Sequence, residues 1–204
     1  MKKLSALLLG VIFLASCASY VNSVKGQQSE KSGKVYLIGK ITFNPEPKQE
    51  LKNLGSGQWK GVFAGNFSNK MEIDEKPTAN FSEKWGEYFI WEIPRADIYL
   101  KCITLVMKAD AGDTVFLNYH TFIPFKFEKD DVFIYIGDIT ITEQKNEMGG
   151  RDTVLKVADN SKYVSETYAK TIKGSGGNFI VPKTKLIESK RIKESAVSHK
   201  VEVY

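Results

Sequence analysis

The chain has few of the residues that build disulfide frameworks and metal sites. Its 204 residues include 2 cysteines, 2 histidines and 6 prolines. Two cysteines cannot hold together a small disulfide-rich fold, and so few prolines exclude a collagen-like chain. His120 and His199 stand far apart, and neither His-x-His nor Cys-x-x-Cys spacing occurs. The sequence therefore predicts no metal site.

The chain also has only a small excess of positive over negative charge, and it has few catalytic motifs. The formal net charge is +5, from 29 basic and 24 acidic residues, which is too mild to indicate a nucleic-acid partner. No Gly-x-Ser-x-Gly motif and no phosphate-binding loop ending in Gly-Lys-Ser/Thr occurs. We therefore expect a protein that is not an enzyme and that needs no cofactor.

The N-terminus carries an apolar run, residues 6–15, that is too short to cross a bilayer, which takes about 20 helical residues. Lys2 and Lys3 precede the run and small residues follow it. A basic start, a short apolar centre and small residues are typical of a secretory signal peptide. Taken alone, this pattern also fits an ordinary soluble secreted protein.

The end of the apolar run distinguishes the signal peptide of a lipoprotein from that of a soluble secreted protein. It reads Leu14-Ala15-Ser16-Cys17, which resembles the lipobox of bacterial lipoproteins at every position. The resemblance implies cleavage after Ser16 and acylation of Cys17, with palmitate-type chains holding the protein to the bilayer of the cell envelope. Each buried methylene contributes about 0.8 kcal/mol, so two or three chains anchor the protein stably. Ala18 after the cysteine implies sorting to the outer membrane.

The composition divides the chain into four regions. Residues 1–16 form the lipoprotein signal peptide, and residues 17–33 are a polar flexible tether. Residues 34–143 are a β domain, and residues 144–204 are a C-terminal extension. Removing the signal takes away two lysines and no acids, so the remaining 188 residues carry a charge of +3.

The β domain is rich in Val, Ile, Tyr, Phe, Trp and Thr, with turn residues every ten positions or so. This pattern is mainly β and predicts an antiparallel β-sandwich of seven to eight strands with one C-terminal helix. Turns are expected around 64–66 and at His120, and Pro124 indicates an edge strand or a bulge. The expected strands are 34–43, 58–64, 66–73, 87–93, 97–107, 113–118, 121–127 and 132–142.

Two of these strands echo each other. Residues 36–42 and 134–140 share Ile, Gly, Ile and Thr at matching offsets. Gly39 and Gly137 then mark places where another segment approaches closely. As the first and last strands of the β domain, the two are expected to pair as neighbours.

Part of the β domain resembles the transthyretin-like, carboxypeptidase-regulatory-type sandwiches. The resemblance lies in Gly86, Tyr88, Phe89, Ile93, Pro94, Asp97, Tyr99 and Leu100, and in the later run 127–139. Leu100 stands one place earlier than in that family, and Ala96 and Asp97 replace a turn glycine. The resemblance implies a sandwich fold and carries no catalytic residues with it.

The C-terminal extension has 12 basic and 7 acidic residues in 145–204. An N-cap at 159–161 and the stripe of Tyr163, Val164 and Tyr168 predict an amphipathic helix over about 160–173 that packs on the sandwich. The glycine-rich stretch 174–178 is expected to be a connector, and the residues beyond it a weakly ordered basic tail.

Few residues stand out as candidates for ligand binding. Trp59 and Trp85 could form a stacking platform for a sugar, although a β core consumes most aromatic residues. The acidic groups 110–113 and 128–131 offer oxygen ligands for calcium, but turn-forming aspartates explain both. Cys102 lies in an apolar run and is expected to be a buried, inert core thiol.

Three functions remain open. The preferred one is a non-catalytic structural or protein-interaction lipoprotein, which recognises a protein partner through a face or an edge strand. The alternative is a surface lipoprotein that binds a carbohydrate or a host ligand, which predicts exposed aromatic side chains gathered on one surface. An envelope enzyme is the third, and it predicts a concave site with paired carboxylates.

Overall fold

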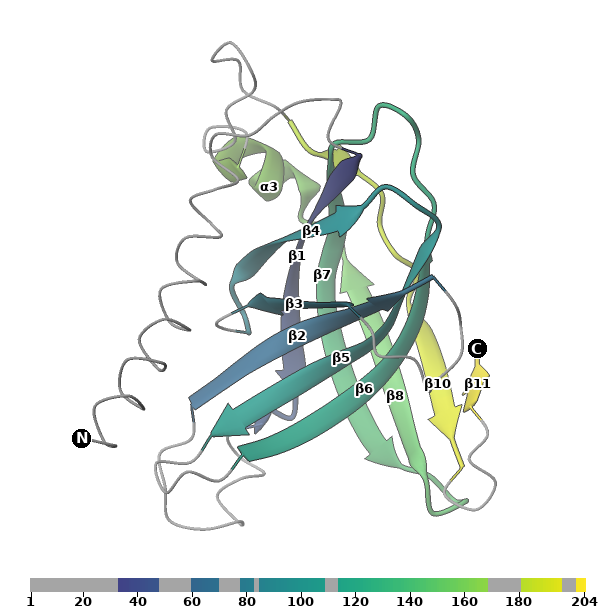
Figure 1. Cartoon of the computed structure of the whole chain (residues 1–204). Coiled ribbons are helices and arrows are strands. Elements are labelled where there is room, and N and C mark those ends of the chain that lie inside the picture. The colour runs from purple at the N-terminus through teal and green to yellow at the C-terminus, as the bar shows by residue number, and fades with distance from the viewer. Residues whose placement is uncertain are drawn as a thin grey trace, which may run out of the picture.

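A computed structural model describes residues 33–47, 60–69, 78–82, 85–108, 114–168, 181–195 and 201–204. They form a mainly β fold with one helix (Figure 1), which confirms the predicted class. Its elements are β1 (Lys34–Asn44), β2 (Lys60–Ser68), β3 (Thr78–Ser82), β4 (Tyr88–Pro94), β5 (Ile98–Lys108), β6 (Thr114–Phe125), β7 (Phe133–Lys145), β8 (Arg151–Ala158), α3 (Ser161–Tyr168), β9 (Lys183–Thr184), β10 (Lys190–Glu194) and β11 (Val201–Val203). Within these ranges no helix is long and apolar enough to cross a membrane.

The strands form two sheets. The larger sheet has seven strands in the order β11-β10-β8-β7-β1-β4, with β9 beside β7, and the smaller has the order β3-β2-β5-β6. The pairing of β1 with β7 confirms that the two echoing strands are neighbours. That pairing is parallel, as is β7 with β9, so the expectation of wholly antiparallel sheets is wrong and the larger sheet is mixed.

Two of the expected turns lie inside strands. β2 runs through 64–66, and β6 runs through His120, so both turn predictions are wrong. A side chain at Gly65 would stand 2.6 Å from the ring of Trp91, so this glycine marks a close approach between the sheets rather than a turn. The prediction for Pro124 is confirmed, because β6 is an edge strand of the smaller sheet.

The two sheets face each other across one apolar core. Phe63 of β2 packs on Trp91 of β4, with ring centroids 5.7 Å apart, and Phe43 of β1 packs on Tyr119 of β6 at 5.1 Å. Trp91 is 1% exposed and is one of the largest side chains in this core. Removal of this apolar surface from water is the main term that stabilises the fold.

The larger sheet continues past residue 143, where the sequence placed a domain boundary. β7 runs on to Lys145, β8 pairs with β7, and β10 pairs with β8. Leu155 and Ile192 of these two strands belong to the same core, as does Ile187. The basic residues Lys190 and Arg191 lie in β10 rather than in a weakly ordered tail.

Helix α3 lies against the face of the larger sheet that points away from the core. Its first turn is capped where the Asp159 carboxylate accepts a hydrogen bond from the Ser161 backbone, at 2.8 Å. Val164 is buried in a small second cluster with Ile38 and Tyr135. The prediction of a docked helix is confirmed for Ser161–Tyr168, and its expected continuation to 173 lies outside the described residues.

Candidate functional site

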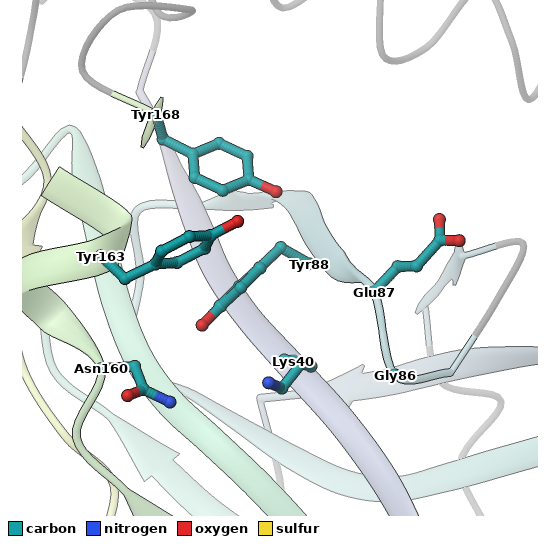
Figure 2. Close-up of a pocket in the computed structure, with 7 residues that line it drawn as sticks. All are labelled: Lys40, Gly86, Glu87, Tyr88, Asn160, Tyr163 and Tyr168. Atoms are coloured by element: carbon teal, nitrogen blue, oxygen red, sulfur yellow. The ribbon is translucent and has the colours of Figure 1, made fainter. Parts of the chain in front are cut away.

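A pocket of about 630 Å³ opens between α3 and the outer face of the larger sheet (Figure 2). Three tyrosines and three polar side chains line it, from β1, the turn before β4, β4 itself, α3 and the residue before α3. The lining residues are Lys40, Gly86, Glu87, Tyr88, Asn160, Tyr163 and Tyr168. We call this the tyrosine pocket.

A bulge in β7 places a carboxylate beneath the tyrosine pocket. The register between β1 and β7 shifts from Ile38↔Tyr135 to Lys40↔Asp138, so β7 has one residue more than β1 over this stretch. Side chains alternate between the two faces of a strand, and an extra residue reverses that alternation. Asp138 therefore shares the outer face with Lys40, while the isoleucines that follow it point into the core.

Asp138 accepts bonds from four donors, three of them on Oδ2 and one on Oδ1. They are Lys40 Nζ at 2.8 Å, Asn160 Nδ2 at 2.6 Å, Tyr88 Oη at 3.1 Å and, on Oδ1, Tyr135 Oη at 2.8 Å. The donors come from β1, β4, β7 and the residue directly before α3. One buried carboxylate thus fixes four elements around the pocket, and its charge is fully compensated.

The tyrosine rings stack on one another above this carboxylate. The ring of Tyr88 lies 5.6 Å from that of Tyr163 in a stacked pair and 5.5 Å from that of Tyr168 in an edge contact. Lys40 Nζ lies 5.2 Å from the Tyr88 ring centroid, in cation–π range. Tyr163 thus packs on the sheet through Tyr88, as expected, but it remains 54% exposed, so part of its ring is open to a ligand.

The electrostatics keep Tyr88, Tyr168 and Asp138 in their ordinary states at neutral pH. Burial, followed by the bond to Asp138, raises the pKa of Tyr88, and burial raises the pKa of Tyr168 to about 12. Burial also acts to raise the pKa of Asp138, but the bonds from Lys40, Asn160 and the two tyrosines outweigh it and lower that pKa. These hydroxyls therefore stay donors and the carboxylate stays charged.

This arrangement suits binding better than proton transfer. A general acid or base works best when its pKa lies near the working pH, and the shifts here move the tyrosines and Asp138 away from neutrality. What the pocket offers a ligand is the exposed ring of Tyr163, with the polar side chains of Asn160 and Glu87 elsewhere in the lining. Apolar ring faces beside polar groups match the mixed surface of a sugar ring.

Of the sequence-predicted ligand and anchor residues, the structure describes Trp85. Cys17 and Trp59 are outside the described residues. Trp85 is partly buried and packs edge-on against the core residue Phe43, with centroids 6.1 Å apart. The exposed aromatic side chain at the tyrosine pocket is Tyr163 instead.

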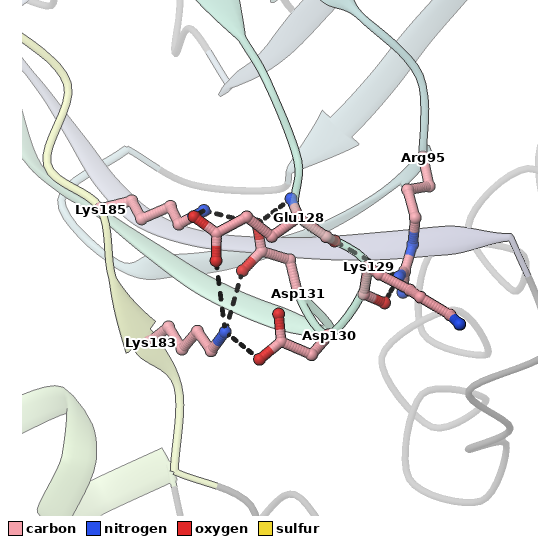
Figure 3. A network of polar contacts seen from close by, with 7 residues as sticks. All are labelled: Arg95, Glu128, Lys129, Asp130, Asp131, Lys183 and Lys185. Carbon is pink, nitrogen blue, oxygen red and sulfur yellow. Dashed lines mark hydrogen bonds and ion pairs between the residues drawn. The ribbon is translucent and has the colours of Figure 1, made fainter.

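The acidic group 128–131 forms ion pairs with two lysines (Figure 3). The carboxylate oxygens of Glu128, Asp130 and Asp131 lie within 4.8 Å of one another, a spacing that a cation could use. Lys185 Nζ lies 2.6 Å from Asp131, and Lys183 Nζ lies 2.6 Å from Asp130. The ion pairs of these carboxylates therefore connect β9 to the turn between β6 and β7. This agrees with the interpretation of the group as turn-forming aspartates. The other acidic group, 110–113, is outside the described residues.

Cys102 and His120 also differ from expectation. Cys102 is half-buried on the outer face of the smaller sheet, not in the core, and its Sγ lies 3.3 Å from Thr104 Oγ1. Burial raises the pKa of this thiol, which disfavours the reactive thiolate. His120 lies within β6, where its Nε2 is 3.8 Å from a carboxylate oxygen of Glu194.

The tyrosine pocket was not anticipated, although one signal for it was present. In the echo of 36–42 and 134–140, Lys40 and Asp138 are the residues that directly follow the two glycines. They pair in register and form the ion pair beneath the pocket, and Thr42 and Thr140 also match, with hydroxyl oxygens 3.1 Å apart. Opposite charges at matching positions of two echoing strands were the usable clue.

Comparison of the chain with family models, with curated proteins and with solved structures finds no match. The function therefore has to be inferred from the geometry of the site and from the sequence.

Proposed function

We propose that the protein is a bacterial envelope lipoprotein, anchored through acylated Cys17, whose β domain binds a carbohydrate in the tyrosine pocket without catalysing a reaction. The observation that supports binding is the exposed ring of Tyr163, held by stacking on Tyr88 above the bonded Asp138. Because the aromatic surface is already ordered, a ligand pays little conformational entropy on binding. The pocket volume of about 630 Å³ suits one or two sugar rings.

The proposal includes a finer statement about the fold. We take the two facing sheets to form a β-sandwich, of the transthyretin-like kind that the motif around Tyr88 and Pro94 resembles. A shared core drawn from both sheets supports this assignment. Such a sandwich gives the pocket a rigid base, since binding sites on strands and helices are positioned more accurately than sites on loops.

The anchor is tested by Cys17→Ala. We expect the wild-type chain to take up labelled palmitate and to enter the detergent phase on Triton X-114 partitioning, because acyl chains supply the membrane affinity. The variant is expected to lose both. Ser16→Ala, which keeps a small residue and the cysteine, is the matched control and should retain both. A Cys17→Ala protein that still enters the detergent phase would contradict the lipobox interpretation.

The carbohydrate site is tested by Tyr163→Ala. Saturation-transfer NMR with glucose, galactose, mannose and N-acetylglucosamine oligosaccharides measures binding to the full chain. We expect at least one to bind, and the variant to weaken it about tenfold, because aromatic stacking contributes up to about 1.5 kcal/mol. Tyr204→Ala is the matched control, since Tyr204 is 62% exposed and lies outside the pocket. Equal losses in both variants, or no binding of any of these sugars, would refute the proposal.

A further inference from the structure

Strand β6 ends the smaller sheet. One side of it pairs with β5, from Lys108↔Thr114 to Ile98↔Phe125. Across the described part of the chain, no strand pairs with its other side. An edge strand of this kind presents backbone N–H and C=O groups that can template a further strand.

One half of this edge is protected and the other is not. At the protected end Phe122 has a φ of +44°, Pro124 removes a donor, and Lys190 Nζ donates to the Phe122 carbonyl at 2.7 Å. Bulges, prolines and lysines are the devices by which natural proteins prevent edge pairing. The stretch 116–120 carries none of them, and its pairing with β5 is regular.

The unprotected half of β6 faces a groove of about 440 Å³, which we call the β6 groove. The wall opposite β6 includes two residues without side chains, Gly149 and Gly150, at the turn between β7 and β8. Strand β8 already has partners on both sides, so the edge that no described strand pairs with is that of β6. A groove of this size admits an extended segment of chain but not a folded domain.

The side chains of the β6 groove indicate what that segment carries. Phe116 is 62% exposed, and the neighbouring Leu117 is partly buried against the core. The ionisable side chains of the groove are two carboxylates, Glu143 and Glu194, the guanidinium of Arg151, which lies 2.9 Å from Glu143, and the imidazole of His120, whose Nε2 lies 3.8 Å from Glu194. The Glu194 side chain is 41% exposed. The apolar side chains of the groove favour apolar residues in a docked strand, and its excess of negative charge favours basic ones. The groove therefore suits a strand in which apolar and basic residues alternate.

We propose that the β6 groove docks an extended, apolar and basic segment of a partner protein, which adds to β6 as a further strand over residues 116–120. This site is built from other residues than the tyrosine pocket and does not depend on carbohydrate binding.

The probe is a capped, fluorescein-labelled octapeptide of alternating valine and lysine, added to the full-length chain. We expect saturable binding by fluorescence anisotropy and slowed amide hydrogen exchange at 116–120. The control is the same octapeptide with N-methyl groups on alternate amides, which keeps the side chains but cannot pair along one edge. It is expected to bind at least tenfold more weakly, because main-chain hydrogen bonds supply much of the affinity in strand addition.

Two chain variants test the side chains. Glu194→Gln and Phe116→Ser should each weaken the octapeptide severalfold, while Glu166→Gln on α3 should not, and the unfolding temperature of each variant reports whether it remains folded. The proposal is overturned by equal affinity for the N-methylated octapeptide, by protection on another edge strand such as β4 or β11, or by no binding at millimolar peptide.

Discussion

Asp138 and Lys190 illustrate two ways in which a charge is accommodated away from water. The carboxylate of Asp138 receives four donors, so its burial leaves no lone charge behind. Lys190 Nζ donates to the Phe122 carbonyl at 2.7 Å, and no carboxylate in the described part of the chain is within salt-bridge distance of it. Burial lowers the pKa of Lys190 to about 8, and Glu188 offsets this in part. Keeping Lys190 charged in the folded protein therefore costs free energy.

This cost predicts a pH dependence of stability. Between about pH 8 and pH 10.5 the unfolded chain keeps the Lys190 proton and the folded protein releases it, so the free energy of unfolding rises with pH across this window. We expect Lys190→Met to remove that contribution. Urea unfolding, followed by tryptophan fluorescence at pH 7, 8, 9 and 9.5, measures this contribution as the difference in the free energy of unfolding between wild type and variant.

Lys162→Met, on the exposed face of α3, is the control for a loss of charge alone. It should differ from wild type by the same amount at each pH. A difference between wild type and Lys190→Met that stays constant with pH would contradict the lowered pKa of Lys190.

At the scale of elements, the decisive feature is the bulge between β1 and β7. Gly137 has a φ of +114°, and a Cβ built there would lie 2.4 Å from a methyl group of Val157 on β8. Only glycine meets both demands. The bulge lets β7 present isoleucines to the core before and after it while turning Asp138 outward. The bulge thus determines both which side chains of β7 enter the core and which one lies beneath the tyrosine pocket.

Gly137→Ala is expected to destabilise the fold by about 2 kcal/mol or more, because backbone strain and overpacking add. The same change should weaken sugar binding, since Asp138 moves with the bulge. Gly149→Ala separates the two causes: Gly149 has a φ of +69° but open space around it, so strain alone predicts a loss of about 1 kcal/mol. Urea unfolding measures both variants, and equal losses would rule out the predicted clash with Val157.

At the scale of the whole molecule, the C-terminal third completes the β domain. It contributes β8, β10 and β11 to the larger sheet and places Leu155, Ile187 and Ile192 in the shared core. It also supplies α3, which forms one wall of the tyrosine pocket. Core, pocket and sheet therefore depend on residues that follow the boundary expected at 143.

Truncation after Glu143 is predicted to leave an aggregation-prone chain, because it uncovers the edge of β7 and removes three core side chains. Size-exclusion chromatography and dye binding to exposed apolar surface measure the outcome. Truncation after Ser195 removes β11 from the described strands and keeps those three side chains, so it should remain monomeric and folded. A soluble, equally stable 1–143 chain would mean that the C-terminal third is an independent arm.

Strands rich in apolar residues were predictable, and strands built largely from charged residues were not. The β-branched and aromatic residues in 34–43 and 132–142 predicted β1 and β7 within a few residues. β10 has the sequence Lys-Arg-Ile-Lys-Glu, in which Ile192 alone is buried, so its composition is that of a solvated tail. Its strand conformation comes from pairing with β8, which is a tertiary interaction.

The sequence by itself determined the β class, the pairing of the two echoing strands and the expectation of an acylated N-terminus, because composition, alternation and short motifs are local properties. The tertiary structure alone decided the parallel direction of β1 and β7, the open edge of β6 and the meeting of Tyr88 with Tyr163 and Tyr168. These features join residues up to about a hundred positions apart, and the free energy that brings them together comes from burying a core that both sheets share.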